Sequence, residues 1–199
     1  MNRGVRFGSA FGAPVVADPS AFLLAVLFSG AMFIHLRATE IAVMPSGWYA
    51  AGAGVAIVGF VYLHELSHSA VAEMKGATTR SIRLYMYGGY SVIDGFPSPT
   101  VEALVAFAGP AASLLMAATL WVISGATGTD TALGATLFAL AMANAAIGAF
   151  NLLPGLPLDG GRVLRGLLSS RNGDRAKATR LVTRIGVVTG FIAMAVGAL

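Results

Sequence analysis

The stretch "VYLHELSHSAVAEMKGA", residues 61–77, places two histidines and a glutamate within five positions of an otherwise apolar sequence. The chain has only 3 histidines among its 199 residues, and 11% of its residues are charged. The group directly follows an uncharged run from Ile41 to Leu63. Ionisable side chains are costly inside a membrane and are generally functional where they occur. This stretch therefore locates the first candidate site, and the apolar run before it indicates the fold.

The composition is that of a membrane protein rather than a soluble domain. Hydrophobic residues make up 56% of the chain, and its mean hydropathy is +0.76. Uncharged runs cover residues 19–34, 41–63, 103–129, 131–158 and 185–199. We predict an all-α polytopic integral membrane protein with about five to six transmembrane helices, since roughly 20 apolar residues cross the hydrocarbon core. The last run stops at Leu199 in mid-segment, as it would in a truncated chain.

The basic residues predict an orientation. The net charge is +4, and seven cations between residues 159 and 184 lie between two apolar runs: Arg162, Arg165, Arg171, Arg175, Lys177, Arg180 and Arg184. Cytoplasmic loops carry such an excess, so the expected anionic neighbour is the lipid headgroup and not nucleic acid. Cations also precede the first run and follow the second. We expect a multi-pass protein of a prokaryotic inner membrane, with its amino terminus and its site toward the cytoplasm.

Two short segments carry β-strand signals. Residues 1–18 are glycine-rich with β-like patches, and residues 78–94 alternate apolar and polar side chains around Ile82 and Leu84. Gly88-Gly89 fits a two-residue hairpin turn. Both segments are too short for a separate folded unit. We therefore expect a single membrane domain over residues 1–199, with a small membrane-associated β-hairpin or sheet.

The spacing of His64 and His68 predicts a metal site. On a helix, positions i and i+4 lie on one face, so both imidazoles can bind one ion. Glu65 lies one step around the helix, where it can act on water without being a ligand. In His-Glu-x-x-His sequences of zinc metalloproteases, the two histidines bind zinc and the glutamate acts as general base.

A third ligand is needed, and the sequence leaves two candidates. No histidine follows His68, and the later glutamates, Glu73 and Glu102, lie too close to it or at a helix entrance. Asp94 follows the hairpin and stays open. Asp159 lies in "FNLLPGLPLDGGR", where prolines and glycines break a helix at membrane depth. Irregular backbone is tolerated there only against protein or a water-filled cavity, which favours Asp159.

Three motifs together resemble one family. "HELSH" (64–68), "FAGPAASLLM" (107–116) and "NLLPGLPLDGGR" (151–162) occur in the order of the signatures of site-2 proteases, which are intramembrane zinc metalloproteases. The resemblance covers most of the chain, from "GVRFGSAFGAPV" at residues 4–15 to Arg162. The chain departs from the envelope-stress branch of that family, since no PDZ-like domain separates the 41–63 and 103–129 runs.

The resemblance implies a site and an activity. His64, His68 and Asp159 would hold one zinc ion per chain, and Glu65 would be the general base. Asn151 matches a residue thought to bind substrate or the developing oxyanion. The implied substrates are membrane proteins with a single span, cut within or near that span in regulated intramembrane proteolysis.

Two other functions compete with this interpretation. A non-proteolytic zinc-binding transporter or scaffold would keep the zinc but tolerate the loss of Glu65. A membrane protease of the prenyl-protein type would need a downstream glutamate as third ligand, and no suitable one follows. A zinc assay combined with cleavage of single-span substrates separates the three.

The hairpin is expected to present the substrate. A peptide bond in a transmembrane helix must be unwound before hydrolysis, and its freed backbone groups then need partners. An exposed β edge over Ser81–Tyr87 would supply them by strand addition, with Tyr87, Gly88 and Gly89 contacting the substrate. The alternative is an interfacial hairpin anchored by its tyrosines.

Overall fold

The computed structural model describes residues 4–39 and 46–197. Within them the chain forms, in order, β1 (Val5–Ala10), β2 (Ala13–Ala17), α1 (Pro19–Ala38), α2 (Ser46–Met74), β3 (Thr78–Tyr85), β4 (Gly88–Asp94), α3 (Pro99–Thr127), α4 (Ala132–Asn151), α5 (Asp159–Asn172) and α6 (Arg175–Gly197). Residues 41–45 of the second apolar run and 198–199 of the last lie outside the described residues.

Helices α1 to α4 are long and apolar enough to cross a membrane. Their lengths of 20 to 29 residues suit a hydrocarbon core of about 30 Å at 1.5 Å per residue. The predicted polytopic, mostly helical fold is confirmed. Helix α5 has only 14 residues, and α6 begins with a basic stretch. Among the residues that the structure describes, four helices meet the criterion, fewer than the five to six predicted.

The uncharged run over residues 131–158 is not one continuous helix. Helix α4 ends at Asn151, and residues 152–158 form an irregular connection before α5 begins at Asp159. Pro154 and Pro157 lack the N–H that a helix interior requires, and Gly155 adds backbone freedom. The predicted break next to Asp159 is therefore present in the structure.

Small residues allow the membrane helices to approach closely. A Cβ added at Gly54 of α2 would overlap the Ala25 carbonyl of α1. A Cβ at Gly148 of α4 would lie 2.8 Å from Cγ of Leu114 on α3. Close packing through small side chains drives helix association in lipid, where the hydrophobic effect gives little. These contacts hold α2 against α1 and α4 against α3, and α2 carries the two histidines.

The four strands form one mixed sheet in the order β1-β2-β3-β4. Strands β1 and β2 pair antiparallel, as do β3 and β4, and β2 pairs parallel with β3 through Val15–Ala17 and Ile82–Leu84. The predicted exposed edge at Ser81–Tyr87 is therefore wrong. Most of that run belongs to β3, whose two edges are both occupied because the amino-terminal segment pairs with it. The edge strands are β1 and β4.

The hairpin turn also differs from the prediction. Tyr85 pairs with Gly88, and Leu84 pairs with Gly89, so the two-residue turn is Met86-Tyr87. Gly88 and Gly89 belong to β4 instead. Gly88 has a φ of 129°, a region that favours glycine. Gly89 lies so close to α2 that a Cβ there would be 2.6 Å from Cγ of Glu65.

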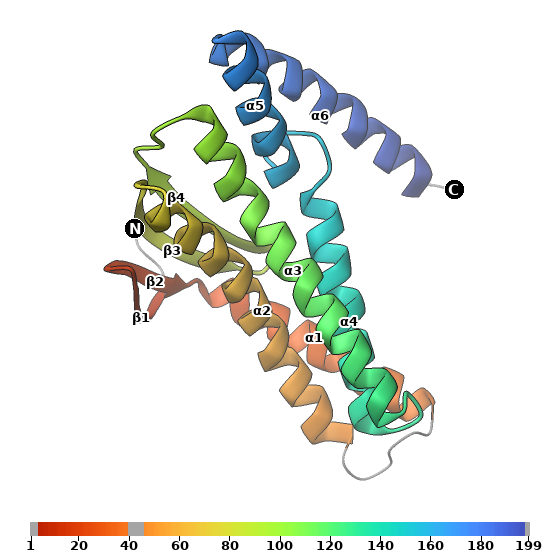
Figure 1. The fold of residues 1–199 in the computed structure, drawn as a ribbon. Coiled ribbons are helices and arrows are strands. Elements are labelled where there is room, and N and C mark those ends of the chain that lie inside the picture. The colour runs from red at the N-terminus through yellow and green to blue at the C-terminus, as the bar shows by residue number, and fades with distance from the viewer. Residues whose placement is uncertain (1–3, 40–45, 198–199) are drawn as a thin grey trace.

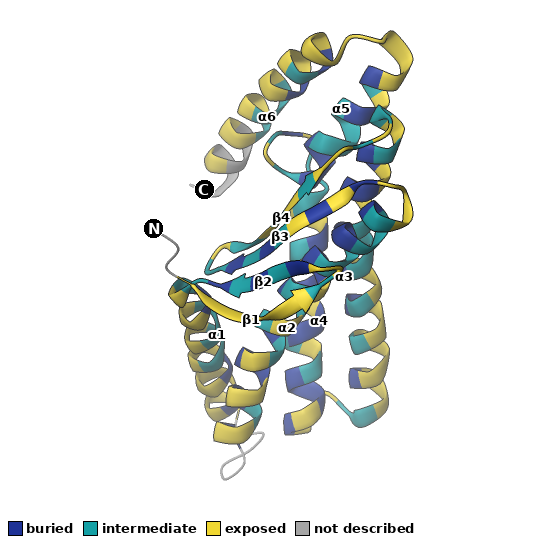
Figure 2. Cartoon of the chain, turned by 90° about the vertical axis from the view of Figure 1, so that its left-hand side faces the viewer, coloured by how far each residue is buried: buried dark blue, intermediate teal, exposed yellow. Residues whose placement is uncertain are grey.

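The sheet and helices α5 and α6 gather at one end of the helical bundle (Figure 1). The sheet lies beside the carboxyl-terminal half of α2, while α5 packs on α3 and α6. Outward faces of the bundle are largely exposed in this chain alone, as expected where lipid would surround it (Figure 2). The half of α2 that contains the histidines is thus enclosed between the sheet, α3 and α5.

Candidate metal and catalytic site

Helix α2 directs three buried ionisable side chains to one place. His64, Glu65 and His68 are only 4%, 5% and 2% exposed. The two imidazole rings lie edge to face with their centroids 4.9 Å apart, as the four-residue spacing predicts. The carboxylate and imidazole ligand atoms of all three residues lie within 4.8 Å of one another. This group could hold a metal ion.

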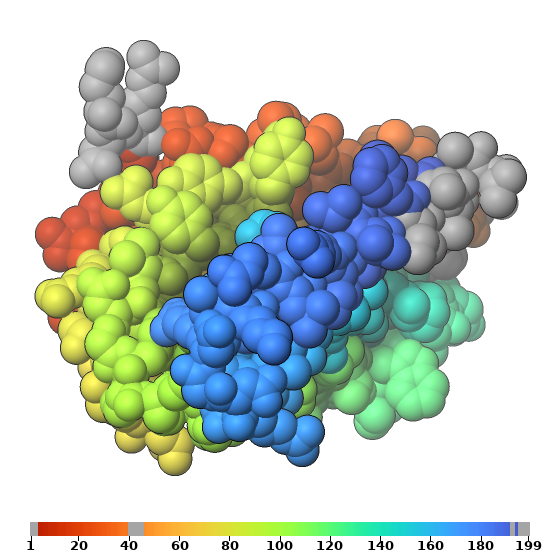
Figure 3. Space-filling view, turned by 90° about the horizontal axis from the view of Figure 1, so that it is seen from above, coloured from red at the N-terminus to blue at the C-terminus, as the bar shows by residue number. Residues whose placement is uncertain are grey.

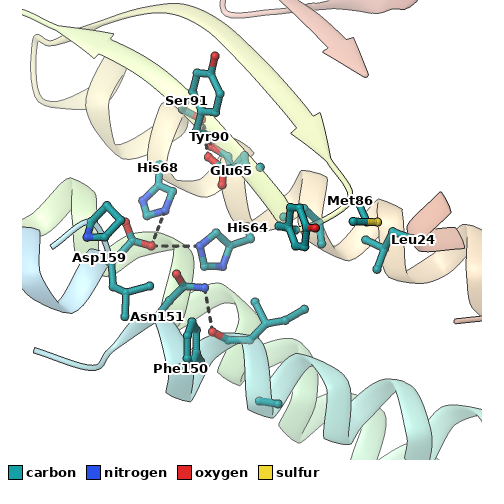
Figure 4. Close-up of a pocket in the computed structure, with 18 of the residues that line it drawn as sticks. Leu24, His64, Glu65, His68, Met86, Tyr90, Ser91, Phe150, Asn151 and Asp159 are labelled. Carbon is teal, nitrogen blue, oxygen red and sulfur yellow. Dashed lines mark hydrogen bonds and ion pairs between the residues drawn. The ribbon is translucent and has the colours of Figure 1, made fainter. Parts of the chain in front are cut away.

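Asp159 completes the group from the other side. It is the first residue of α5, and its Oδ2 lies 3.2 Å from Nε2 of His64 and 3.2 Å from Nε2 of His68 (Figure 4). Two ligands that are each about 2.0–2.2 Å from a tetrahedral zinc ion lie roughly 3.3 Å apart. The Asp159 oxygen is therefore close to the separation from each histidine nitrogen that zinc requires, and the donor set is one that zinc accepts.

Hydrogen bonds on the far side of each ring hold both imidazoles in the metal-binding orientation. Nδ1 of His68 lies 2.7 Å from the carbonyl oxygen of Val105. A carbonyl only accepts, so Nδ1 carries the hydrogen and Nε2 of the neutral ring keeps its lone pair for a ligand bond. Nδ1 of His64 lies 2.8 Å from Oγ of Ser113 and can donate in the same way. Such outer contacts fix the tautomer and the ring direction at zinc sites.

The charge state of Asp159 also suits a ligand. Burial raises the pKa of Asp159, but the close contacts of its carboxylate with His64 and His68 and the charge of Arg162 hold that pKa well below its usual range. Nη1 of Arg162 lies 3.3 Å from Oδ1 of Asp159, one turn along α5. The carboxylate is therefore ionised at neutral pH, with Oδ1 held by the arginine and Oδ2 directed to the histidines.

Glu65 has a different set of contacts from Asp159. Its Oε2 accepts a hydrogen bond of 2.9 Å from Oγ of Ser91 on β4. Whereas one oxygen of Asp159 is shared between both histidines, the carboxylate of Glu65 is held beside them by the sheet. This arrangement makes Asp159 the better third ligand and leaves Glu65 as an acid or base next to the ion.

The other acidic candidates are engaged elsewhere. Asp94 forms an exposed ion pair with Arg80 at 3.2 Å. Oε1 of Glu73 accepts the backbone N–H of Thr79 at 2.6 Å. Glu102 is buried in ion pairs with arginines of α5 and α6. His35 is exposed on α1 and lies outside the group. Of the two aspartates that the sequence left open, the structure brings Asp159 to the histidines and not Asp94.

A cavity of about 750 Å³ opens onto these residues. It lies between α2, the β3–β4 hairpin, α4 and the start of α5, and its lining includes Asn151, Tyr87, Gly88 and Gly89. Seen from above, the surface is hollowed between the hairpin and helices α5 and α6 (Figure 3). All four residues predicted to contact substrate therefore share one cavity with His64, Glu65, His68 and Asp159.

Comparisons with known proteins agree with this geometry. Residues 41–156 match the family model described as Peptidase M50B-like, and residues 125–193 match Peptidase family M50. The chain belongs to the M50 peptidase family, that of the site-2 proteases. A relative from Synechocystis, named "Putative zinc metalloprotease sll0528", is 34% identical over 100% of this chain and 53% of its own length. "Putative zinc metalloprotease Rip3" of Mycobacterium tuberculosis is 36% identical over 74% of this chain and 38% of its own.

A solved structure has the same fold. The site-2 protease from Methanocaldococcus jannaschii superposes with a TM-score of 0.65 and 28% sequence identity, over 98% of this chain and 85% of that one. This chain spans about half the length of the Synechocystis relative and a smaller share of Rip3. The family expectation of a multi-pass zinc metalloprotease fold is confirmed.

Three residues at the site were not predicted. The contact between Arg162 and Asp159 could have been predicted, because side chains three residues apart on a helix are neighbours. Ser113 lies within the "FAGPAASLLM" motif, but its spacing to His64 gives no indication of contact. Ser91 lies in a plain alternating strand sequence, and nothing in its neighbourhood points to Glu65. These contacts between α2 and distant segments depend on tertiary packing.

Proposed function

We propose that this chain is a zinc metalloendopeptidase of the site-2 protease type, which hydrolyses peptide bonds within or near the transmembrane segments of single-span membrane proteins. One observation carries the proposal: a single Asp159 oxygen lies 3.2 Å from Nε2 of both histidines, with Glu65 buried beside them. His64, His68 and Asp159 would hold one zinc ion per chain. When bound, zinc supplies Lewis-acid polarisation of water and of the scissile carbonyl.

Glu65 is the proposed general base. Its carboxylate would take a proton from the attacking water as the oxygen–carbon bond forms. It would return that proton to the nitrogen of the leaving amine as the carbon–nitrogen bond breaks. Ser91 occupies only one side of its Oε2, so the carboxylate keeps acceptor capacity toward the cavity.

Asn151 is placed to bind the substrate carbonyl. Its side-chain N–H₂ group donates one hydrogen to the Ile147 carbonyl at 2.9 Å. An amide nitrogen carries two hydrogens, so a second donor remains for a developing oxyanion in the cavity. Asn151 lines the cavity close to the group that contains Asp159.

Strand β4 is the proposed substrate edge. It pairs with β3 on one side, and no strand within residues 4–39 and 46–197 pairs with its other side. Its first residues, Gly88 and Gly89, line the cavity together with Tyr87. An unwound peptide could therefore gain backbone hydrogen bonds along β4 while its scissile bond lies near Glu65. Tyr87, whose side chain is exposed, would contact the substrate at the cavity mouth.

The orientation is part of the same proposal. The site lies at the end of the bundle where the sheet, α5 and α6 gather. Lys75 directly follows α2, Arg80 belongs to β3, and α5 and α6 supply a further basic stretch. The excess of cations at this end supports a cytoplasmic location for it and for the amino terminus. The relatives named above come from bacteria and an archaeon, which supports a prokaryotic cell membrane.

Cleavage by purified protein in detergent or vesicles tests the activity. The wild-type chain with one equivalent of zinc should cut a panel of single-span substrates, and Glu65→Gln should bind zinc yet cut none. The glutamine keeps the size of the side chain but cannot accept a proton at neutral pH. If Glu65→Gln cleaves as fast as wild type, the proposed mechanism is wrong. Zinc binding without cleavage of any substrate would support a transporter or scaffold instead.

A further inference from the structure

Strand β4 contacts helix α2 at Glu65, the proposed general base. Alternate β4 residues, among them Gly89 and Ser91, face α2, while Tyr90 and Val92 are exposed. A Cβ at Gly89 would lie 2.6 Å from Cγ of Glu65. The strand therefore passes directly over the glutamate side chain, and Gly89 is required for that approach.

Ser91 forms two contacts with the same glutamate. Its Oγ lies 2.9 Å from Oε2 of Glu65 and 3.1 Å from the backbone carbonyl oxygen of Glu65. Both of those oxygens accept, so the serine hydroxyl is the donor to them. One hydroxyl of the edge strand thus holds both the side chain and the main chain of the base (Figure 4).

A second buried serine supports this hydroxyl. Oγ of Ser69, on the next turn of α2, donates to Oγ of Ser91 at 3.4 Å. Ser69 is fully buried. Because the hydrogen of Ser91 is committed to Glu65, its lone pairs are free to accept from Ser69. The three groups form a chain of donors that ends on the Glu65 carboxylate.

We propose that Ser91 is a positioning residue for Glu65, and that it couples the edge strand β4 to the base. The inference rests on the proposed function, in which Glu65 moves the proton. A carboxylate with free rotation about its side-chain bonds would spend part of its time directed away from the scissile bond. The Ser91 bond restricts that rotation by holding Oε2, and Oε1 lies outside this hydrogen bond.

The coupling has a consequence for substrate selection. A peptide paired with the free edge of β4 would rigidify the strand that holds Glu65. A peptide that enters the cavity without pairing would meet a base held less firmly. Segments able to form an extended strand would therefore be cut faster at equal occupancy, which is a difference in kcat rather than in KM.

Steady-state cleavage by zinc-loaded protein is the first arm of the test. Ser91→Ala should lower kcat about tenfold to a hundredfold, the range expected for a misplaced catalytic group, and leave KM and zinc content unchanged. Ser91→Thr, which keeps the hydroxyl on a strand-favouring side chain, should restore most of kcat. Ser67→Ala is the matched control and should behave as wild type, because Ser67 is a partly exposed serine of α2 whose hydroxyl donates to the Leu63 carbonyl.

Amide hydrogen exchange in the metal-free protein is the second arm, and it does not depend on activity. Glu65→Ala and Ser91→Ala should each speed exchange of the β4 amides severalfold relative to those of β1. Glu65→Gln should not, because its amide oxygen still accepts from Ser91. Unchanged β4 exchange in Glu65→Ala, or wild-type kcat in Ser91→Ala, would overturn the inference. A wild-type chain that cleaves nothing would instead contradict the proposed function, while the exchange arm still tests the Ser91–Glu65 coupling.

Discussion

The backbone of Gly109 on α3 lies directly against the metal-facing edges of His68 and His64. A Cβ at this position would overlap Nε2 of His68 and would lie 2.6 Å from Nε2 of His64. The space in front of both ligand atoms therefore exists because residue 109 has no side chain. Helices α2 and α3 can approach closely here and still leave room for an ion.

Gly109→Ala should lower zinc affinity without unfolding the protein. The methyl group would force both imidazoles out of the ligand positions, whereas alanine in a helix interior is otherwise favoured over glycine by about 0.5–1 kcal/mol. Zinc titration against a competing chelator measures the affinity, and thermal unfolding of the metal-free protein reports the fold. Gly125→Ala on the same helix, where an added Cβ meets nothing within 4 Å, is the control. Equal zinc affinity in the two variants would contradict this account.

Ser113→Ala should weaken zinc binding about tenfold to a hundredfold, the usual effect of removing an outer hydrogen bond from a histidine ligand. Ser113 is the partner of Nδ1 of His64 at 2.8 Å, and without it the ring can rotate or change tautomer. Ser124→Ala provides the comparison, since Ser124 is also buried on α3 but bonds to the Trp121 carbonyl. A Ser113→Ala protein with wild-type zinc affinity would show that Val105 and packing alone orient the histidines.

The sequence predicted the parts of the site that lie close together along the chain. Helical spacing was enough to join His64 to His68 and to place Glu65 beside them. The helix break before Asp159 followed from Pro154 and Pro157, because proline lacks the donor that a helix needs. Apolar length likewise predicted α1 to α4, since nearly every residue of a span must be compatible with lipid.

The sequence could not predict the pairing of distant strands. Ala13–Ala17 joins β3 in parallel across more than sixty residues, and such register depends on tertiary packing and not on local alternation. The glycines of β4 were misplaced for a related reason. Gly88-Gly89 has the composition of a turn, but Gly89 is needed for contact with Glu65, and Met86-Tyr87 forms the turn instead.

Asp159→Ala should weaken zinc binding by more than about a hundredfold, and so by more than Ser113→Ala, because it removes one of the three proposed ligands. Asp94→Ala should leave the stoichiometry near one zinc per chain, since Asp94 pairs only with exposed Arg80 among the contacts described. Metal analysis after dialysis against a weak chelator separates the two variants. Zinc loss in Asp94→Ala with full retention in Asp159→Ala would move the third ligand to the hairpin.

Helix α5, which carries Asp159, is held to α3 by a buried ion-pair cluster. Glu102 is 2% exposed in the first turn of α3, and it pairs with Arg165 of α5 and with Arg175 of α6. The Arg175 contact is 3.0 Å, but its side chain is 57% exposed, whereas that of Arg165 is mostly buried. Gly166 also brings the backbone of α5 against Pro99 and Ala103.

Glu102→Ala should lower the free energy of unfolding by about 3–5 kcal/mol, because it leaves the buried guanidinium of Arg165 without its counter-charge. Arg175→Ala should cost only about 0–1 kcal/mol, as expected for a solvent-exposed pair, and that small effect should fade further in high salt. Denaturant unfolding in mild detergent measures both, and double-mutant cycles with Glu102 give the two coupling energies separately. Zinc affinity should fall in Glu102→Ala as well, since α5 then loses the contact that fixes the helix carrying Asp159. Equal coupling energies for Arg165 and Arg175 would show that burial does not set the strength of this cluster.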